Sequence, residues 1–151
     1  MSNKILLDSS ILIEYIKGSK TDLLDALLQS NHSLFYNPVI ASEYLFHLLA
    51  VSANKSPLSV KSSNKIREVL EKESRFVDFL LELSFTELSE NDITFSTVLM
   101  KDFNLLPNDS LIISNAISKD IKFIATYDAD FSVPCKKFDI QIVSEIADLK
   151  W

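Results

Sequence analysis

The stretch KILLDSSILIEYIKG, residues 4–18, predicts how the fold begins. Its first four residues are too few for a helix and show no polar alternation, so they predict a strand buried on both faces, as in a parallel sheet. Ser9 and Ser10 then offer N-cap oxygens for a helix over ILIEYIK, which is expected to end at Gly18. Asp8 therefore stands where a buried strand ends, and a carboxylate at that position needs an explanation.

The same alternation of strands and helices continues along the chain. The apolar spacing of residues 20–30 predicts an amphipathic helix, SLFY at 33–36 predicts a second strand, and Pro38 predicts the first turn of a long helix. A further helix, in one or two pieces, is expected over about 60–83, and others over 89–103 and from the cap Asn108 onward. Strands are expected at 84–88, 121–126 and 140–143. This order predicts a single α/β domain over residues 1–151, a three-layer α/β/α sandwich with a mostly parallel central sheet.

The composition excludes several functional classes. The single cysteine, Cys135, cannot form an internal disulfide, and with only His32 and His47 beside it no zinc site of Cys and His ligands can form. One glycine, Gly18, is too few for a P-loop or a Gly-x-Gly-x-x-Gly dinucleotide site. The net charge of −6 argues against a generally basic surface for nucleic acid, although metal ions in an acidic pocket can supply positive charge instead.

Hydrophobic residues make up 47% of the chain, which is ordinary for a globular protein. No apolar run approaches the roughly 18 residues that cross a bilayer, and the N-terminus lacks the pattern of a signal peptide. We therefore expect a cytoplasmic protein without a membrane partner.

Five acidic residues are expected at one edge of the sheet or on an apolar helix face. Asp8 ends the first strand, and Asp128 and Asp130 follow FIAT, so these strands deliver carboxylates to the edge where parallel sheets bind ligands. Glu43 and Asp109 share helical stripes with apolar residues, so both are expected to lean toward the core. Acids gathered in this way repel one another unless cations lie among them, and Mg²⁺ or Mn²⁺ prefers carboxylate and water oxygens.

Each acid also has a purely structural explanation. Asp8 is a good N-cap for the helix that follows it, and Asp109 complements the helix dipole from the first turn. Glu43 can pair with His47 one turn later. Asp128 and Asp130 can bond the nearby backbone in a turn.

Four segments of the sequence resemble the motifs of PIN-domain ribonucleases, and most closely those of the small VapC-type toxins of toxin–antitoxin pairs. These segments are LLDSSILIEYIKG, NPVIASEYL, NDSLIISNA and IATYDADF. In this order they extend the resemblance from Lys4 to about Val143, nearly the whole chain.

The resemblance implies a site and a chemistry. Its catalytic and metal-binding residues would be Asp8, Glu43, Asp109 and Asp128, with Asp130 as a further metal ligand and with Ser10 and Thr126 as hydroxyl residues beside the site. One or two Mg²⁺ or Mn²⁺ ions would activate water and stabilise charge on the phosphate during cleavage of single-stranded or structured RNA. The implied partners are the RNA substrate, a cognate antitoxin protein and a second copy of the chain in a homodimer.

Two other functions remain open from the sequence. The same PIN-like fold can serve as an RNA-processing module or as a non-catalytic binding module in an RNA complex. The Asp-x-Asp of YDADFS suggests a haloacid-dehalogenase-like phosphatase, but that motif should follow the first strand, whereas here it lies close to the end of the chain. Core packing rather than base stacking is expected for the four aromatic residues near the second strand, Phe35, Tyr36, Tyr44 and Phe46.

Overall fold

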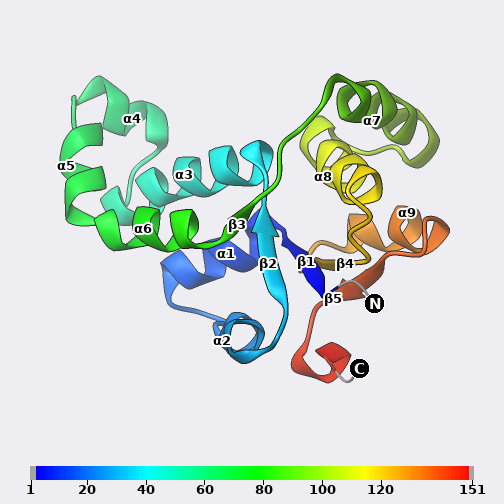
Figure 1. Cartoon of the computed structure of the whole chain (residues 1–151). Helices are drawn as coiled ribbons and strands as arrows, with labels where there is room; N and C mark the ends of the chain where they lie inside the picture. The colour runs from blue at the N-terminus through cyan, green and yellow to red at the C-terminus, as the bar shows by residue number, and fades with distance from the viewer. Residues whose placement is uncertain (1–2, 150–151) are drawn as a thin grey trace.

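The computed structural model describes residues 3–149, and its strands form one parallel sheet (Figure 1). The strands lie in the order β3-β2-β1-β4-β5. Their bounds are Lys4–Leu7 for β1, Ser33–Tyr36 for β2, Ser84–Phe85 for β3, Phe123–Ala125 for β4 and Gln141–Val143 for β5. In the middle of the sheet, Leu6 of β1 lies between Phe35 of β2 and Ile124 of β4. The predicted α/β/α fold with a parallel central sheet is confirmed.

Helices cover the sheet from both sides. In Figure 1, α3 to α6 gather on one side of the strands and α7 to α9 on the other. The bounds are Ser9–Lys17 for α1, Asp22–Gln29 for α2, Pro38–Ala53 for α3, Pro57–Ser62 for α4, Ile66–Lys72 for α5, Ser74–Glu82 for α6, Glu90–Phe103 for α7, Pro107–Ser118 for α8 and Ser132–Lys137 for α9. Two short 3₁₀ helices, η1 (Ala129–Phe131) and η2 (Ile146–Leu149), follow β4 and β5.

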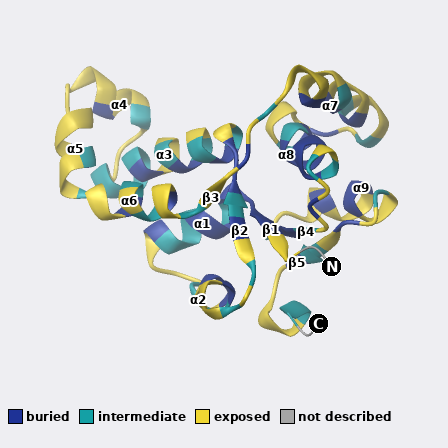
Figure 2. Ribbon diagram, in the orientation of Figure 1, coloured by how far each residue is buried: buried dark blue, intermediate teal, exposed yellow. Residues whose placement is uncertain are grey.

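The centre of the sheet is fully buried (Figure 2). Ile5, Leu6 and Leu7 of β1 are all 0% exposed, as are Ile124 and Ala125 of β4. Strands buried on both faces have no solvent side, which is why KILL shows no polar alternation. Each such aliphatic side chain contributes roughly 1.5–3 kcal/mol by leaving water. Polar side chains that follow these strands can therefore reach solvent only at the strand ends.

The start of α1 confirms the alternative expectation that Asp8 caps this helix, and the start of α8 differs from the sequence-based expectation. The N-cap of α1 is Asp8, whose Oδ2 accepts from the backbone N–H of Ser10 at 3.4 Å, while Ser9 and Ser10 are already helical. Helix α8 begins at Pro107, so the expected cap Asn108 is wrong. Proline suits the first helical position because its φ is preset and its missing N–H needs no partner there. The side chain of Asn108 is thereby available for a different contact.

The helix expected over residues 60–83 is divided into the three short helices α4, α5 and α6. Asn64 has a φ of 57° between α4 and α5, a left-handed conformation that ends a helix. Within residues 3–149, no helix is long and apolar enough to span a membrane.

Candidate functional site

Acidic residues from distant parts of the chain meet in one cleft at the carboxyl edge of the sheet. The cleft has a volume of about 530 Å³. It is lined by Asp8, Ser9, Ser10, Ile13, Ser42, Glu43, Phe46, His47, Asn108, Asp109 and Asp128. None of these lining residues is Lys or Arg, so the cleft holds an excess of negative charge.

Asp8 lies at the bottom of this cleft and is only 4% exposed. Its Oδ2 accepts from the hydroxyl of Ser10 at 2.6 Å and from the hydroxyl of Thr126 at 2.8 Å. Burial raises the pKa of the Asp8 carboxyl, and the nearby Glu43 adds to that rise, although the two hydroxyl hydrogen bonds oppose it. Asp8 thus caps α1 and also belongs to the acidic cleft, so its two explanations are compatible.

The hydroxyls of Ser10 and Thr126 connect the ends of the two central strands. The Ser10 hydroxyl also accepts from the backbone N–H of Tyr127 at 3.0 Å, and that of Thr126 accepts from the N–H of Asp128 at 3.0 Å. These bonds hold the segment after β4 against the start of α1. The position of Asp128 relative to Asp8 is therefore set by hydrogen bonds as well as by strand pairing.

Glu43 reaches the cleft from the second turn of α3. Its carboxylate accepts a hydrogen bond from the hydroxyl of Ser9, and its Oε1 accepts from Nδ2 of Asn108 at 2.6 Å. The Glu43 carboxylate is thus bonded to α1 and α8 rather than to His47, whose ring packs against Phe46 with centroids 5.9 Å apart. An acid on an otherwise apolar stripe is explained by these two partners from neighbouring helices.

Three carboxylates form the tightest acidic group. Asp109, Asp128 and Asp130 each place an oxygen within 4.8 Å of the others. Asp109 is half-buried, whereas Asp128 and Asp130 are exposed. Asp128 is also a turn residue, since its Oδ1 accepts from the N–H of Asp130 at 2.9 Å. The structural role of Asp128 in the turn therefore does not compete with its place in the acidic group.

Asp109 is the acid whose ionisation is most strongly opposed. Burial first, and then the carboxylates of Asp128, Asp8, Glu43 and Asp130, raise the pKa of Asp109 to about 6. A bound cation would reverse this effect, because it favours the charged form of each carboxylate. The close group of Asp109, Asp128 and Asp130 offers carboxylate oxygens and no thiol or imidazole, which fits Mg²⁺ or Mn²⁺ and not a soft metal.

The structure also brings residues to the cleft that the sequence did not single out. Phe46 was expected in the core, and this is wrong: its side chain is 54% exposed and lines the cleft, whereas Tyr44 is 0% exposed. Phe46 lies three residues after Glu43, so the helical period alone could have placed it beside the acid. Ser9 and Asn108 lie next to Asp8 and Asp109 in the chain, but their bonds to Glu43 depend on how three helices pack.

The parallel sheet, the helices on both sides and the acids at its carboxyl edge define a class of protein. A sequence profile of the PIN domain matches residues 5–137. The chain belongs to the PIN-domain family. It is 30% identical over 146 residues to "Ribonuclease VapC2" of Methanocaldococcus jannaschii, covering 95% of each chain. It is 25% identical over 154 residues to "Ribonuclease VapC6" of the same organism, covering 95% of this chain and 98% of that protein.

Two solved structures share the fold at low sequence identity. A chain of a toxin–antitoxin complex from Klebsiella pneumoniae aligns with a TM-score of 0.62 and 17% identity, over 93% of this chain and 96% of that one. A chain of VapBC2 from Rickettsia felis, bound to a DNA fragment from its promoter, aligns with a TM-score of 0.64 and 17% identity, over 93% and 99%. These likenesses concern the fold alone.

Proposed function

We propose that this protein is a metal-dependent endoribonuclease that acts as the toxin of a toxin–antitoxin pair. The observation that carries the proposal is the cleft in which Asp8, Glu43, Asp109 and Asp128 face one space, with Asp130 beside them. The names of the two relatives, both called ribonucleases, support the same activity. The whole chain, residues 1–151, would work as a single PIN-like domain.

Asp109, Asp128 and Asp130 are the residues that would hold a divalent cation first, because their oxygens are already close. Asp8 would contribute from the bottom of the cleft, and Glu43 would either bind the ion or orient water. A bound ion would lower the pKa of a water molecule and would stabilise negative charge on the phosphate. Mg²⁺ and Mn²⁺ both suit the oxygen donors, and we propose Mg²⁺ or Mn²⁺ as the cofactor.

The side chains around the acids would keep them in one arrangement. The hydroxyls of Ser10 and Thr126 hold Asp8 in the orientation it has in the cleft. Ser9 and Asn108 hold Glu43, because the hydroxyl and the amide each donate a hydrogen bond to its carboxylate. The arrangement thus offers fixed acceptors around the position where a phosphodiester would bind.

The substrate we propose is single-stranded or structured RNA. The cleft is open enough for a phosphodiester backbone, and its negative charge would be neutralised by the bound cation. The half-exposed ring of Phe46 lines the cleft and offers a flat apolar face to an unstacked base. An RNA substrate also implies that the protein acts in the cytoplasm.

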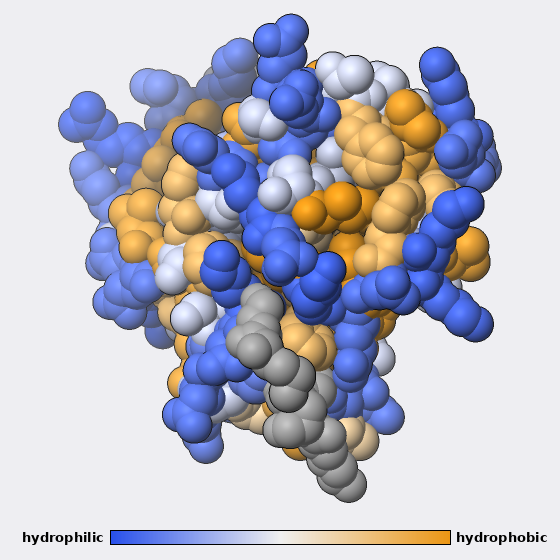
Figure 3. Space-filling model, turned by 45° about the vertical axis from the view of Figure 1, so that its right-hand side comes forward, coloured by the Kyte–Doolittle hydropathy of each residue, from blue (hydrophilic) through white to orange (hydrophobic). Residues whose placement is uncertain are grey.

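A cognate antitoxin and a second copy of the chain are the proposed protein partners. Several large apolar side chains in and between α7, α8 and α9 are exposed, among them Leu106 just before α8 at 72%, Val133 of α9 at 67% and Ile93 of α7 at 56%. Figure 3, which brings this side of the molecule forward, shows apolar surface between hydrophilic side chains. Exposed apolar surface of this kind is typical of protein contacts.

A cleavage assay with defined oligoribonucleotides tests the proposed activity. Cleavage should require Mg²⁺ or Mn²⁺, stop in EDTA and disappear in Asp8→Asn and Asp109→Asn. Asp139→Asn is a matched control, because Asp139 is an exposed acid with a φ of 54° that asparagine tolerates well. RNA binding without cleavage, or cleavage that ignores the chelator, would favour a non-catalytic binding module or a contaminating nuclease over our proposal.

A further inference from the structure

Two buried amides, Asn37 and Asn115, join the helices that carry Glu43 and Asp109. Asn37 is the N-cap of α3 and Asn115 lies in α8, and both are 0% exposed. Nδ2 of Asn37 donates to Oδ1 of Asn115 at 3.2 Å, across 78 positions of the chain. A buried amide is unfavourable unless its hydrogen bonds are satisfied, so this pair calls for a physical account.

The orientation of both amides is fixed by their other partners. Oδ1 of Asn37 accepts from the backbone N–H of Ile40 at 3.0 Å, so its Nδ2 must face Asn115. Nδ2 of Asn115 donates to the carbonyl of Glu87 at 2.9 Å and to Oδ2 of Asp92 at 3.4 Å, so its oxygen must face Asn37. Turning either amide would place oxygen against oxygen, and the pair therefore has one satisfied arrangement.

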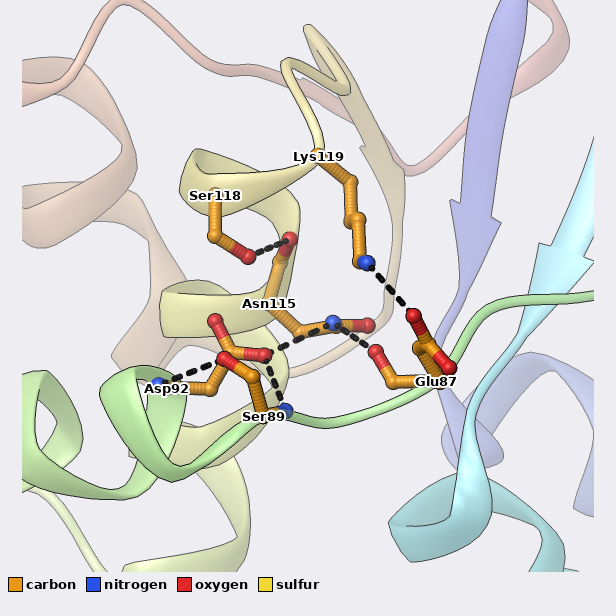
Figure 4. A network of polar contacts seen from close by, with 6 residues as sticks. All are labelled: Glu87, Ser89, Asp92, Asn115, Ser118 and Lys119. Carbon is orange, nitrogen blue, oxygen red and sulfur yellow. Dashed lines mark hydrogen bonds and ion pairs between the residues drawn. The ribbon is translucent and has the colours of Figure 1, made fainter.

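A rigid support holds Asn115 from the far side (Figure 4). Asp92 belongs to the capping box of α7, in which its Oδ2 accepts from the N–H of Ser89 at 2.8 Å and its own N–H donates to the Ser89 hydroxyl at 3.2 Å. Lys119, just after α8, forms an ion pair with Glu87 at 3.5 Å. The start of α7 and the end of α8 are joined mainly through the hydrogen bonds of the Asn115 amide to Glu87 and Asp92, and the exposed ion pair adds little.

Within residues 3–149, two side-chain hydrogen bonds join α3 and its cap to α8, and the bond from Asn37 to Asn115 is one of them. The other is the bond from Asn108 to Glu43 in the cleft. The two bonds are six residues apart on α3 and seven on α8, or about 9 Å and about 10 Å along the helices. Two separated bonds fix both the distance and the relative rotation of two helices, whereas one bond allows them to pivot.

The two bonds differ in their exposure to the substrate: the bond from Asn37 to Asn115 is buried, and the bond from Asn108 to Glu43 is exposed. Water, substrate or an ion can compete with Asn108 for the Glu43 carboxylate, because that bond lies in the cleft, whereas Asn37 and Asn115 are buried and do not line the cleft. We propose that the Asn37–Asn115 hydrogen bond is a positioning pair, which keeps Glu43 of α3 in register with Asp109 of α8 when Glu43 changes partners. This inference rests on the proposed ribonuclease function and adds residues outside the acidic cleft to it.

The variant Asn37→Ser removes the bridge and keeps the cap. Serine ranks with asparagine at N-cap positions, so the N–H of Ile40 keeps an acceptor, but the short side chain cannot reach Asn115 and adds no charge. Val69→Ala is the stability control, because Val69 is a buried residue of α5 that does not line the cleft. Both variants are compared as the full chain, at temperatures where each is fully folded.

Three measurements separate positioning from general stability. We expect Asn37→Ser to lower kcat for a defined RNA about ten- to a hundredfold with little change in KM, since small misplacements of reacting groups have effects of this size. Calorimetric titration with Mn²⁺ should show about tenfold weaker binding, the effect typical of lost support behind metal ligands. Hydrogen exchange in the first turn of α8 should become faster. Val69→Ala should leave kcat and the Mn²⁺ affinity within about twofold of the parent protein.

The outcomes distinguish the failure of this inference from the failure of the proposed function. If the parent protein cleaves RNA and Asn37→Ser behaves like Val69→Ala, the positioning pair is refuted and the ribonuclease is not. Faster exchange in α8 with unchanged kcat and Mn²⁺ affinity would likewise make the pair merely structural. A parent protein that neither binds Mn²⁺ nor cleaves RNA would overturn the proposed function, and the inference with it.

Discussion

Asp109 shows most clearly how a single residue can be unfavourable for the fold and useful for a site. Its carboxyl is half-buried, and this burial, followed by four nearby acids, raises its pKa to about 6. Near neutral pH the charged form is therefore held in the fold against burial and repulsion. A divalent cation among these carboxylates removes both penalties, so metal binding and stability should be linked.

Asp109→Asn should stabilise the metal-free protein. The amide keeps the shape of the side chain but removes the charge that the surrounding acids oppose. After allowance for solvent screening, we expect a gain of about 1 kcal/mol at pH 7.5, or about 3 °C in Tm. Thermal melting in EDTA measures this gain, and Asp139→Asn should show no comparable rise. A lower Tm for Asp109→Asn in EDTA would mean that the acids do not repel one another in the fold.

Phe46→Ala should weaken RNA binding without altering the chemical step. Stacking of one base on an aromatic ring is worth about 1–3 kcal/mol, so KM should rise roughly 5- to 150-fold while kcat stays close to that of the parent protein. The Tm should change little, because the ring is already 54% exposed. Steady-state kinetics on a short single-stranded RNA measure both constants. An unchanged KM, together with weaker binding of a protein partner, would assign Phe46 to a protein contact instead.

At the scale of elements, α1 must end sharply because it lies between the site and the next helix. Gly18 has a φ of 69° at its C-terminus, and the next N–H, that of Ser19, bonds back to the carbonyl of Glu14 at 3.0 Å. This is the left-handed helix ending that glycine adopts without a steric penalty. The only glycine of the chain is therefore used where the backbone requires it.

Gly18→Ala should destabilise the protein by about 1 kcal/mol. An added Cβ would meet no atom within 4 Å, so the effect would come from the backbone conformation and not from a clash. Urea denaturation measures the change in the free energy of unfolding. Asn54→Gly is the matched control, because Asn54 ends α3 with a φ of 50° and glycine should be neutral or slightly stabilising there. A neutral Gly18→Ala would show that the end of α1 can rearrange freely.

At the scale of the whole molecule, the acidic cleft should make the effect of metal depend on pH. The native Asp109 carboxyl keeps its proton up to about pH 6, whereas the ordinary value is 3.8. Its contribution to stability is therefore fully present below about pH 3.8 and is lost as the pH rises through 6. The advantage of Asp109→Asn in EDTA should grow over the same interval.

Mg²⁺ should consequently raise the Tm of the parent protein more at pH 7.5 than at pH 5. At the lower pH, a proton on the Asp109 carboxyl, whose pKa is raised to about 6, competes with the cation. Thermal melting with 10 mM Mg²⁺ or with EDTA at both pH values tests this linkage. An equal rise at both values, or an equal rise in Asp109→Asn, would place the ion somewhere other than the cleft.

The sequence alone determined the architecture and the individual acids of the cleft. Short aliphatic runs such as KILL predict buried strands, and apolar residues spaced by three and four predict helices. Both patterns are local, because they reflect which faces of an element are buried. Asp8 and Asp128 could be placed at one edge, since the carboxyl ends of parallel strands share that edge. Local patterns were less reliable for helix ends: Asn108 was expected as a cap, but Pro107 starts α8.

Only the tertiary structure decided how the acids are held. The bonds from Ser9 and Asn108 to Glu43, and from Asn37 to Asn115, join residues between 34 and 78 positions apart. The helical period places Phe46 beside Glu43, but the exposure of its ring depends on which helices pack beside α3. Contacts of this kind leave no period in the sequence, because a side chain's partners on other elements are set by packing in three dimensions and not by its neighbours along the chain.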